Sequence, residues 1–329
     1  DVYKRQIEYN AGSNGGNISF KVDRSSIRQG NAVIAIKDVS DAILWSWHVW
    51  VTDEDINNVI EITNHQNVKY NFMPVNLGQC DGNTITYEER SCKVKFIAGD
   101  QSKEITIKQL ANVIATGSNA PFYQWGRKDP LYPSNGMGNT TKIWYDKEGI
   151  PSTANPMKGT FSAGNDCIKN CILNPNLMHN RYNGDYTYYN LWSADNKTTS
   201  ANDNPVNKTI YDPCPVGFKL PASNAFTGFT TTGESVSSST QVNGTWSSSE
   251  KGWYFYTNSE KTQSIFFPAL GYRSYSTMRP GSIGTQGCFW SAHPVAKGNN
   301  YYLRTSSVDV QPTYMVDRGF GYALRPCQD

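Results

Sequence analysis

Short runs of alternating apolar and polar residues dominate the chain and predict strands. The first runs fall at 18–22, 32–36 and 43–51. A period of two along 43–51 gives one face with Leu44, Ser46, His48 and Trp50 and another with Trp45, Trp47 and Val49. Further runs at 84–87, 93–97 and 103–107 predict a β-meander, or hairpin insertion, at about 80–110.

Helical signals are few. The best candidate is 166–173, which ends at Asn174-Pro175 because proline disfavours a helical conformation at the residue before it. Residues 131–165 are rich in Gly, Pro, Asn and Ser and predict a long loop. From Trp192 onwards, short aromatic runs alternate with turn residues. The pattern predicts an α+β, β-dominated fold with long loops and little helix.

The composition fits strands and turns and excludes some functions. The 329 residues include 27 Gly, 20 Tyr and 9 Trp, and only 18% are charged, which is low for a cytosolic enzyme. The formal net charge is +2. No Lys/Arg stripe is visible, which argues against a nucleic-acid partner. Apolar runs such as 32–36 are far too short to span a membrane.

The chain starts at Asp1 without a Met, which indicates a mature product or a fragment whose export signal lies outside these residues. We expect residues 1–17 to be a linker or the remnant of an upstream region. Residues 18–329 should form a single domain. The expected location is extracellular, at the cell surface, on the outer membrane or at a pilus tip.

Cysteine usage also favours an exported protein. The seven cysteines are Cys80, Cys92, Cys167, Cys171, Cys214, Cys288 and Cys327. None forms a CxxC pair and the histidines are scattered, so disulfides in an oxidising compartment are the better interpretation than a zinc site. We expect Cys80–Cys92 to close a hairpin and Cys214–Cys327 to tie the late chain to its end. At least one thiol should remain unpaired.

Several long motifs follow one another along the chain. FYQWGRKDP occupies 122–130, after Asn76-Leu77-Gly78, and KTIYDPCPVGFKLP occupies 208–221. The others are GNAVIAIKD at 30–38, ILWSWHVWVTD at 43–53, LGYR at 270–273, FWS at 289–291 and GFGYALRP at 319–326. In this order they resemble the Fibrobacter succinogenes major paralogous domain family, over roughly residues 28–329.

The resemblance implies a C-type-lectin-like domain in a protein similar to Bacteroidetes pilus-tip and cell-surface lipoprotein adhesins. It implies a glycan or protein ligand on a host or bacterial surface, pilus subunits as further partners, and no cofactor. The chain departs from the family at Pro74-Val75, where Asp-Arg is usual, and at Phe218, where Trp is usual. Cys288 stands where the family has Tyr or a neutral residue.

Three motif segments have both a functional and a structural interpretation. For the tryptophans of 43–51, the functional interpretation is a sugar-stacking groove. The structural interpretation, which we expect, is packing in the core. For the charged segment 127–129, the functional interpretation is ligand binding. The structural interpretation, which we favour, is an ion-paired turn beside Trp125. Two prolines fix the corner at 212–215. No cationic residue adjoins Cys214 in sequence to activate it, so its role should be structural.

The terminal stretch 290–318 carries the candidate ligand-binding residues Trp290, His293, Asn299, Tyr302, Arg304, Gln311, Tyr314 and Arg318. Tyr, Asn and Arg supply stiff contact area and adaptable hydrogen bonds, and binding residues often lie above a rigid scaffold. We expect Tyr301 and Leu303 to be buried and Tyr302 and Arg304 to face outward. The alternative is ordinary strand packing with solvated loops.

The leading hypothesis is a non-catalytic adhesin that binds a glycan or protein through this terminal surface. One alternative is a structural pilus or surface subunit, with the strands at 18–37 open to a donor strand. Another is an enzyme similar to formylglycine-generating oxidases, which needs a close pair of reactive cysteines, and only Cys288 and Cys327 qualify as late candidates. No metal is expected, because calcium-lectin motifs are absent and the acidic residues are dispersed.

Overall fold

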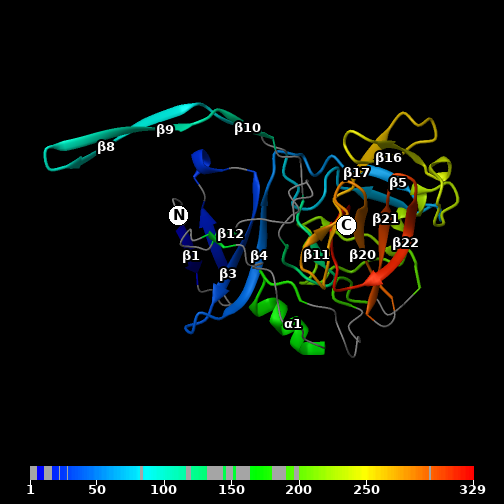
Figure 1. Ribbon diagram of the computed structural model, residues 1–329. Coiled ribbons are helices and arrows are strands. Elements are labelled where there is room, and N and C mark those ends of the chain that lie inside the picture. The colour runs from blue at the N-terminus through cyan, green and yellow to red at the C-terminus, as the bar shows by residue number, and fades with distance from the viewer. Residues whose placement is uncertain are drawn as a thin grey trace.

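The computed structural model describes residues 6–10, 17–21, 23–27, 29–81, 84–115, 120–131, 144–145, 151–152, 164–179, 190–195, 200–295 and 298–329. Within these ranges, small antiparallel sheets gather into one body, and N-terminal ribbons and a long arm extend from it (Figure 1). The helical elements described are α1 (Gly164–Leu173) and the short 3-10 segments η1 (Arg24–Ser26), η2 (Ser223–Phe229) and η3 (Ser239–Gln241). The predicted β-dominated class with little helix is confirmed, and the helix expected at 166–173 lies within α1.

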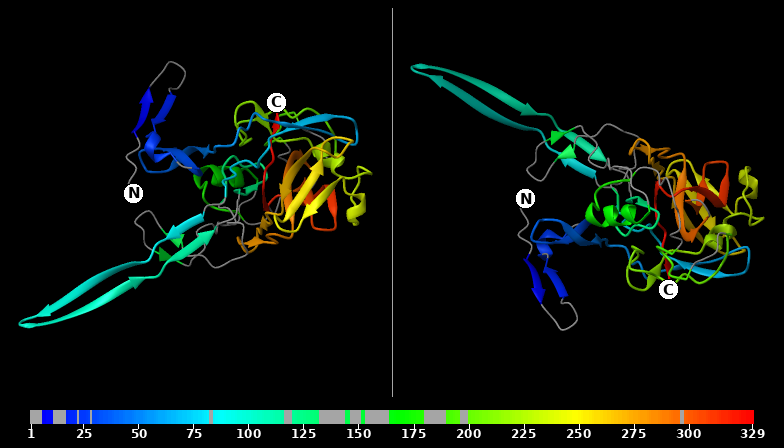
Figure 2. Two further views of the ribbon diagram at one scale, coloured as in Figure 1. Left: turned by 90° about the horizontal axis from the view of Figure 1, so that it is seen from above. Right: turned by 90° about the horizontal axis from the view of Figure 1, so that it is seen from below.

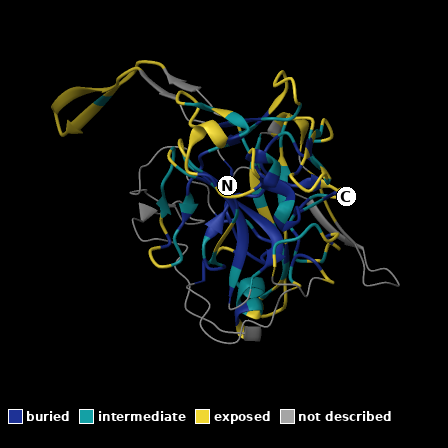
Figure 3. Cartoon of the chain, turned by 90° about the vertical axis from the view of Figure 1, so that its right-hand side faces the viewer, coloured by how far each residue is buried: buried dark blue, intermediate teal, exposed yellow. Residues whose placement is uncertain are grey.

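A three-stranded sheet lies at the centre of the body. Its strands are β20 (Gly287–Pro294), β21 (Asn299–Thr305) and β22 (Val310–Asp317), paired in that order. Side chains alternate across a strand. Phe289 and Leu303 therefore enter one core cluster, and Trp290 and Tyr302 enter the other. All eight positions of β20 are buried. Figure 3 shows buried strands at the centre of the body.

The two clusters are built largely from aromatic rings. The first stacks Phe229 on Phe255 with ring centroids 4.0 Å apart, and Phe267 meets both rings edge-on. The second contains Trp125 and Trp192, with centroids 5.4 Å apart. Wide rings bury large apolar areas, so a chain with long connections still has a substantial core.

Two further sheets enclose these clusters. The first consists of β15 (Gly244–Ser247), β16 (Gly252–Tyr256) and β17 (Ser264–Pro268). The second is made of two-residue strands in the order β11 (Tyr123–Gln124), β23 (Gly321–Tyr322), β18 (Tyr272–Arg273) and β19 (Pro280–Gly281). The motifs 122–130, 270–273 and 319–326 therefore meet in one sheet.

The end of the chain returns to an early segment. The sheet has the order β14 (Phe218–Lys219), β24 (Cys327–Gln328), β6 (Lys69–Phe72) and β5 (Ile60–Thr63). Arg325, 1% exposed, donates to Asn76 Oδ1 at 2.7 Å and to the carbonyls of Met73, Pro74 and Phe266 at 2.7–3.2 Å. The bonds to Met73, Pro74 and Asn76 join segments about 250 residues apart.

Two ribbons precede the body. They are β1 (Gln6–Asn10) with β2 (Asn17–Lys21), and β3 (Gly30–Lys37) with β4 (Ile43–Val51). Part of the linker expected at 1–17 is thus a strand. As predicted, Ser46, His48 and Trp50 share a face: all three bond to segments of the body, and α1 packs against β4. Leu44, predicted on the same face, is 52% exposed. Trp47 is 43% exposed, so the expectation that it lies in the core is wrong.

The insertion at 80–110 is one long hairpin rather than a meander. At its base β7 (Thr84–Tyr87) pairs with β10 (Asn112–Ala115), and beyond them β8 (Arg90–Ala98) pairs with β9 (Gln101–Gln109). This arm projects away from the body in both views of Figure 2. A separate two-stranded pair consists of β12 (Trp144–Tyr145) and β13 (Pro151–Ser152). The rest of the loop predicted at 131–165 is outside the described residues, except for Leu131 and the first two residues of α1.

All seven cysteines belong to the described part of the chain, and none forms a disulfide. The predicted Cys80–Cys92 pair is wrong because the hairpin turns at Gly99 and Asp100, which carries Cys92 onto the arm opposite Ile107. The predicted Cys214–Cys327 pair is also wrong. The chain end is held instead by pairing of Cys327 with Lys219 and Phe72.

Among the described residues, no helix combines the length and the apolar character needed to cross a membrane.

Candidate ligand-binding surface

Four of the eight candidate binding residues lie in the interior. Trp290 and His293 are fully buried in β20, and Tyr302 in β21 is 4% exposed. The Trp290 indole Nε1 donates to the carbonyl of Tyr123 at 2.8 Å, and its ring packs on Tyr322. The expectation that Tyr302 faces outward is wrong, because core clusters cover both faces of this sheet.

Arg318, the fourth buried candidate, is 4% exposed. Its guanidinium lies 4.2 Å from the centroid of the Trp125 ring, and its Nε donates to the carbonyl of Asn299 at 3.3 Å. Asn299 itself is partly exposed at the start of β21. Because of these contacts, Arg318 is part of the scaffold rather than of an open surface.

The other three candidates, Arg304, Gln311 and Tyr314, form one partly exposed patch on β21 and β22. Arg304 pairs with Gln311 in the strand register. Tyr314 is 46% exposed, and its ring meets the buried ring of Tyr302 edge-on with centroids 5.7 Å apart. The Arg304 guanidinium lies 5.9 Å from the Tyr314 ring centroid. A buried aromatic ring thus supports an exposed one.

Asp309 completes this terminal patch, and the sequence reasoning missed it. It closes the turn between β21 and β22, where its N–H donates to Ser306 Oγ at 3.2 Å and its carbonyl accepts from Ser306 N at 2.8 Å. Asp309 Oδ2 accepts from Arg304 Nη1 at 2.6 Å and from Gln311 Nε2 at 3.4 Å. The available signal was an acidic residue after a Ser-Ser turn, five positions beyond a basic residue.

The polar groups of the patch are an ion pair and two covered acceptor oxygens. Burial lowers the pKa of Arg304, but the hydrogen bond and charge of Asp309 outweigh that effect and raise it overall. Asp309 Oδ1 and Gln311 Oε1 are both covered and accept no hydrogen bond from any described residue. Such acceptors are costly to leave unsatisfied, and because both are covered, a ligand reaches them only if the side chains around them move.

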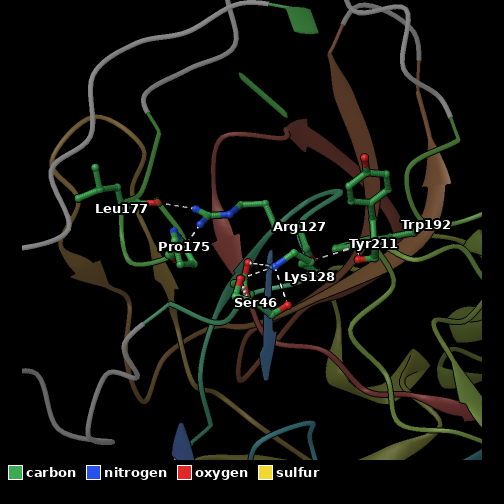
Figure 4. Close-up of polar contacts among 8 residues, drawn as sticks. Ser46, Arg127, Lys128, Pro175, Leu177, Trp192 and Tyr211 are labelled. Carbon is green, nitrogen blue, oxygen red and sulfur yellow. Dashed lines mark hydrogen bonds and ion pairs between the residues drawn. The ribbon is translucent and has the colours of Figure 1, made fainter. Parts of the chain in front are cut away.

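The charged segment 127–129 is an ion-paired turn, as expected. Lys128 Nζ bonds to Asp129 Oδ2 at 2.6 Å, to the carbonyl of Ser46 at 2.9 Å and to the Ser46 hydroxyl (Figure 4). Asp129 Oδ1 accepts from Ser46 Oγ at 2.9 Å. The Lys128 ammonium also lies 4.5 Å from the Trp45 ring centroid. These contacts attach β4 to the body. The charges of Lys128 and Asp129 are therefore already engaged within the protein.

Arg127 is equally occupied. It donates to the carbonyls of Pro175 and Leu177, at 2.9 and 2.5 Å, and thereby fixes the segment that follows α1 (Figure 4). The Trp192 indole in turn donates to the carbonyls of Arg127 and Tyr211, at 3.2 and 3.0 Å. This motif builds the scaffold, and the terminal patch is the more open surface.

The two late cysteines lack the character of reactive thiols. Cys288 and Cys327 are 1% and 2% exposed, and burial raises the pKa of each to about 12. Both are therefore protonated at neutral pH. Within the described ranges, no group of three or more His, Cys, Asp or Glu residues is arranged to hold a metal ion.

Comparisons of the chain with protein-family models, curated proteins and solved structures found no match.

Proposed function

We propose that this protein is a non-catalytic surface adhesin whose domain is C-type-lectin-like. It recognises a glycan or protein ligand through the terminal patch of Arg304, Asp309, Gln311 and Tyr314. The observation that carries the proposal is the contrast within β21 and β22, where a buried Tyr302 supports an exposed Tyr314 beside a partly exposed ion pair. A stiff aromatic surface flanked by polar groups is typical of recognition sites.

The family motifs support the proposal by the positions they occupy. Tyr123 of the 122–130 motif pairs with Tyr322 of the terminal motif, and Trp125 Nε1 donates to the carbonyl of Ser291 at 3.2 Å. Lys208 donates to the carbonyls of Cys214, Pro215 and Phe218 at 2.5–2.8 Å. The residues of the motifs thus support the terminal sheet. None of the patch residues belongs to a motif.

The patch chemistry indicates which ligands suit it. The Tyr314 ring offers an apolar face, and the partly exposed ion pair of Arg304 and Asp309 beside it offers polar contacts. Sugar hydroxyls meet both requirements, because a pyranose has an apolar face and several O–H groups. A peptide with an exposed backbone N–H or an asparagine side chain meets them less completely.

A structural subunit is the second candidate function, and the arm is the observation that favours it. On one face of the arm, Cys92 pairs with Ile107 and Val94 with Ile105, and Phe96 follows at the far end. Phe96, Ile105 and Ile107 are 57%, 42% and 52% exposed. A two-stranded ribbon with an apolar face and free edges is suited to packing against another subunit.

The deciding experiment is an array of glycans and host surface proteins probed with the purified chain. Wild type should give reproducible hits that weaken at least tenfold in Tyr314→Ala and in Arg304→Gln. Trp47→Ala is the matched control, because Trp47 is exposed to a similar extent on β4. Hits that survive Tyr314→Ala but disappear in Trp47→Ala would move the site to β4. Polymerisation without hits would favour the structural subunit.

A further inference from the structure

Two cysteines lie one turn apart on α1, beside a cleft that the proposed adhesin function does not use. Cys167 is 1% exposed and Cys171 is partly exposed. The cleft encloses about 330 Å³ of empty space, part of it open to solvent, and Cys171 lines it together with residues 126–129, Ile168, Ile172, Leu191 and Tyr211. Residues four apart share one face of a helix, so Cys167 lies behind Cys171.

The surroundings of Cys171 stabilise a thiolate. A hydrogen bond from the Cys167 thiol lowers the pKa of Cys171 well below its ordinary value, and the charge of Arg127 and a hydrogen bond from His179 act in the same direction against burial. Arg127 is 3% exposed, and its Nε bonds to no described residue. Lys128 and Asp129, which also line the cleft, bond to each other and nearly cancel in charge.

Four other thiols show the opposite behaviour. Burial raises the pKa of Cys288 and of Cys327 to about 12, and it also raises the pKa of Cys214 and of Cys80. Cys171 therefore combines a thiol donor one turn away with a neighbouring guanidinium and a position in the wall of a cleft. Cys288 also has a guanidinium nearby, that of Arg304, but burial outweighs it there.

We propose that Cys171 is a modification site that takes up a small thiol from a low-molecular-weight disulfide. The Cys171 thiolate attacks one sulfur of the disulfide RSSR, a protein–S–S–R bond forms and the S–S bond of the reagent breaks. The second sulfur leaves as RS⁻ and takes a proton from water. The two oxidised sulfurs of the reagent supply the oxidising equivalents, so no other oxidant is needed.

The mixed disulfide should persist. Cβ atoms one helical turn apart lie about 5–6 Å from each other, whereas a disulfide requires about 3.5–4.5 Å. Cys167 therefore cannot attack Cys171 Sγ and displace the small thiol without opening the last turns of α1. The product is a stable adduct rather than an internal disulfide.

The test is incubation of the reduced protein with oxidised glutathione at about pH 6, followed by intact mass and peptide mapping. Exposed Cys92 is the internal reference, so the comparison needs no variant. Cys171 should gain one glutathionyl group about tenfold faster than Cys92, because its larger thiolate fraction outweighs its lower intrinsic nucleophilicity. Cys167→Ala should shift the pH midpoint of Cys171 alkylation upward, and Cys171→Ser should abolish the fast adduct.

Two results would overturn the proposal. One is a Cys171 rate at or below that of Cys92 at about pH 6. The other is recovery of an internal Cys167–Cys171 disulfide in place of the glutathione adduct. Loss of array binding by the adhesin patch leaves both readouts unchanged, so this proposal and the proposed function fail separately.

Discussion

Acidification should destabilise the fold through His293, a residue that the sequence placed among the ligand-binding candidates. His293 is fully buried, and its Nδ1 accepts from the backbone N–H of Ser223 at 3.3 Å. A ring nitrogen that accepts from an N–H cannot also carry a proton. Burial lowers the pKa of His293 from 6.5 to about 4, although the charge of Asp203 opposes this.

The sign and size of the effect follow from proton linkage. Between about pH 6.5 and about pH 4 the unfolded chain binds a proton at this histidine that the folded chain does not, so stability falls as the pH falls. The shift of about 2.5 pKa units corresponds to a loss of about 2.5 kcal/mol between about pH 7 and about pH 4.5. Below about pH 4 the folded histidine also becomes protonated, and the loss levels off.

Urea unfolding followed by tryptophan fluorescence across this pH range measures the effect. His293→Asn keeps an acceptor for Ser223 but does not titrate. The advantage of wild type over this variant in free energy of unfolding should therefore shrink by about 2.5 kcal/mol on acidification. Leu303→Ala, in the neighbouring strand, is the control, because it should lower stability by a similar amount at every pH. Parallel profiles for wild type and His293→Asn would refute the reasoning.

Three further predictions concern the scaffold. Arg325→Met should lower the free energy of unfolding by about 3–5 kcal/mol in a urea titration, because it leaves two buried and two partly buried acceptors without their donor, and a loss below about 1 kcal/mol would contradict the clamp. Gly271→Ala should cost at least about 2 kcal/mol, since φ is +75° and a Cβ would lie 2.2 Å from the carbonyl oxygen of Gly281; an unchanged Tm would show that the turn relaxes freely. Replacing 90–109 by a Gly-Gly turn should shift the Tm of the body by less than about 2 °C, because the side chains of these residues are exposed except for Val94. Loss of the cooperative transition would show that the arm supports the body.

Local signals made much of the fold predictable. The strand expected at 43–51 has the bounds of β4, and the helix expected at 166–173 lies inside α1. Periodicity and helix-ending residues act over a few positions, so one sequence contains them. The faces of Ser46 and His48 were predictable for the same reason.

The orientation of the terminal strands was not predictable in this way. Alternation separated Tyr302 from Leu303 correctly, but it could not show that both faces would be covered. Tyr302 is buried by Tyr322 and Trp290, whose positions depend on pairings between distant segments. Buried strands with both faces covered lack a polar side. Asp309 was missed because its contact with Arg304 depends on the length of the turn between β21 and β22. That length is set by how the two strands pair.

Recognition through the terminal patch can be tested by the affinity of the strongest array ligand for three proteins. Isothermal titration of wild type, Tyr314→Ala and Trp47→Ala compares two aromatic side chains of similar exposure on different surfaces. We expect Tyr314→Ala to raise the Kd at least tenfold, about 1.4 kcal/mol, and Trp47→Ala to leave it within about twofold. An unchanged Kd for Tyr314→Ala in a protein that still folds would contradict recognition through the terminal patch.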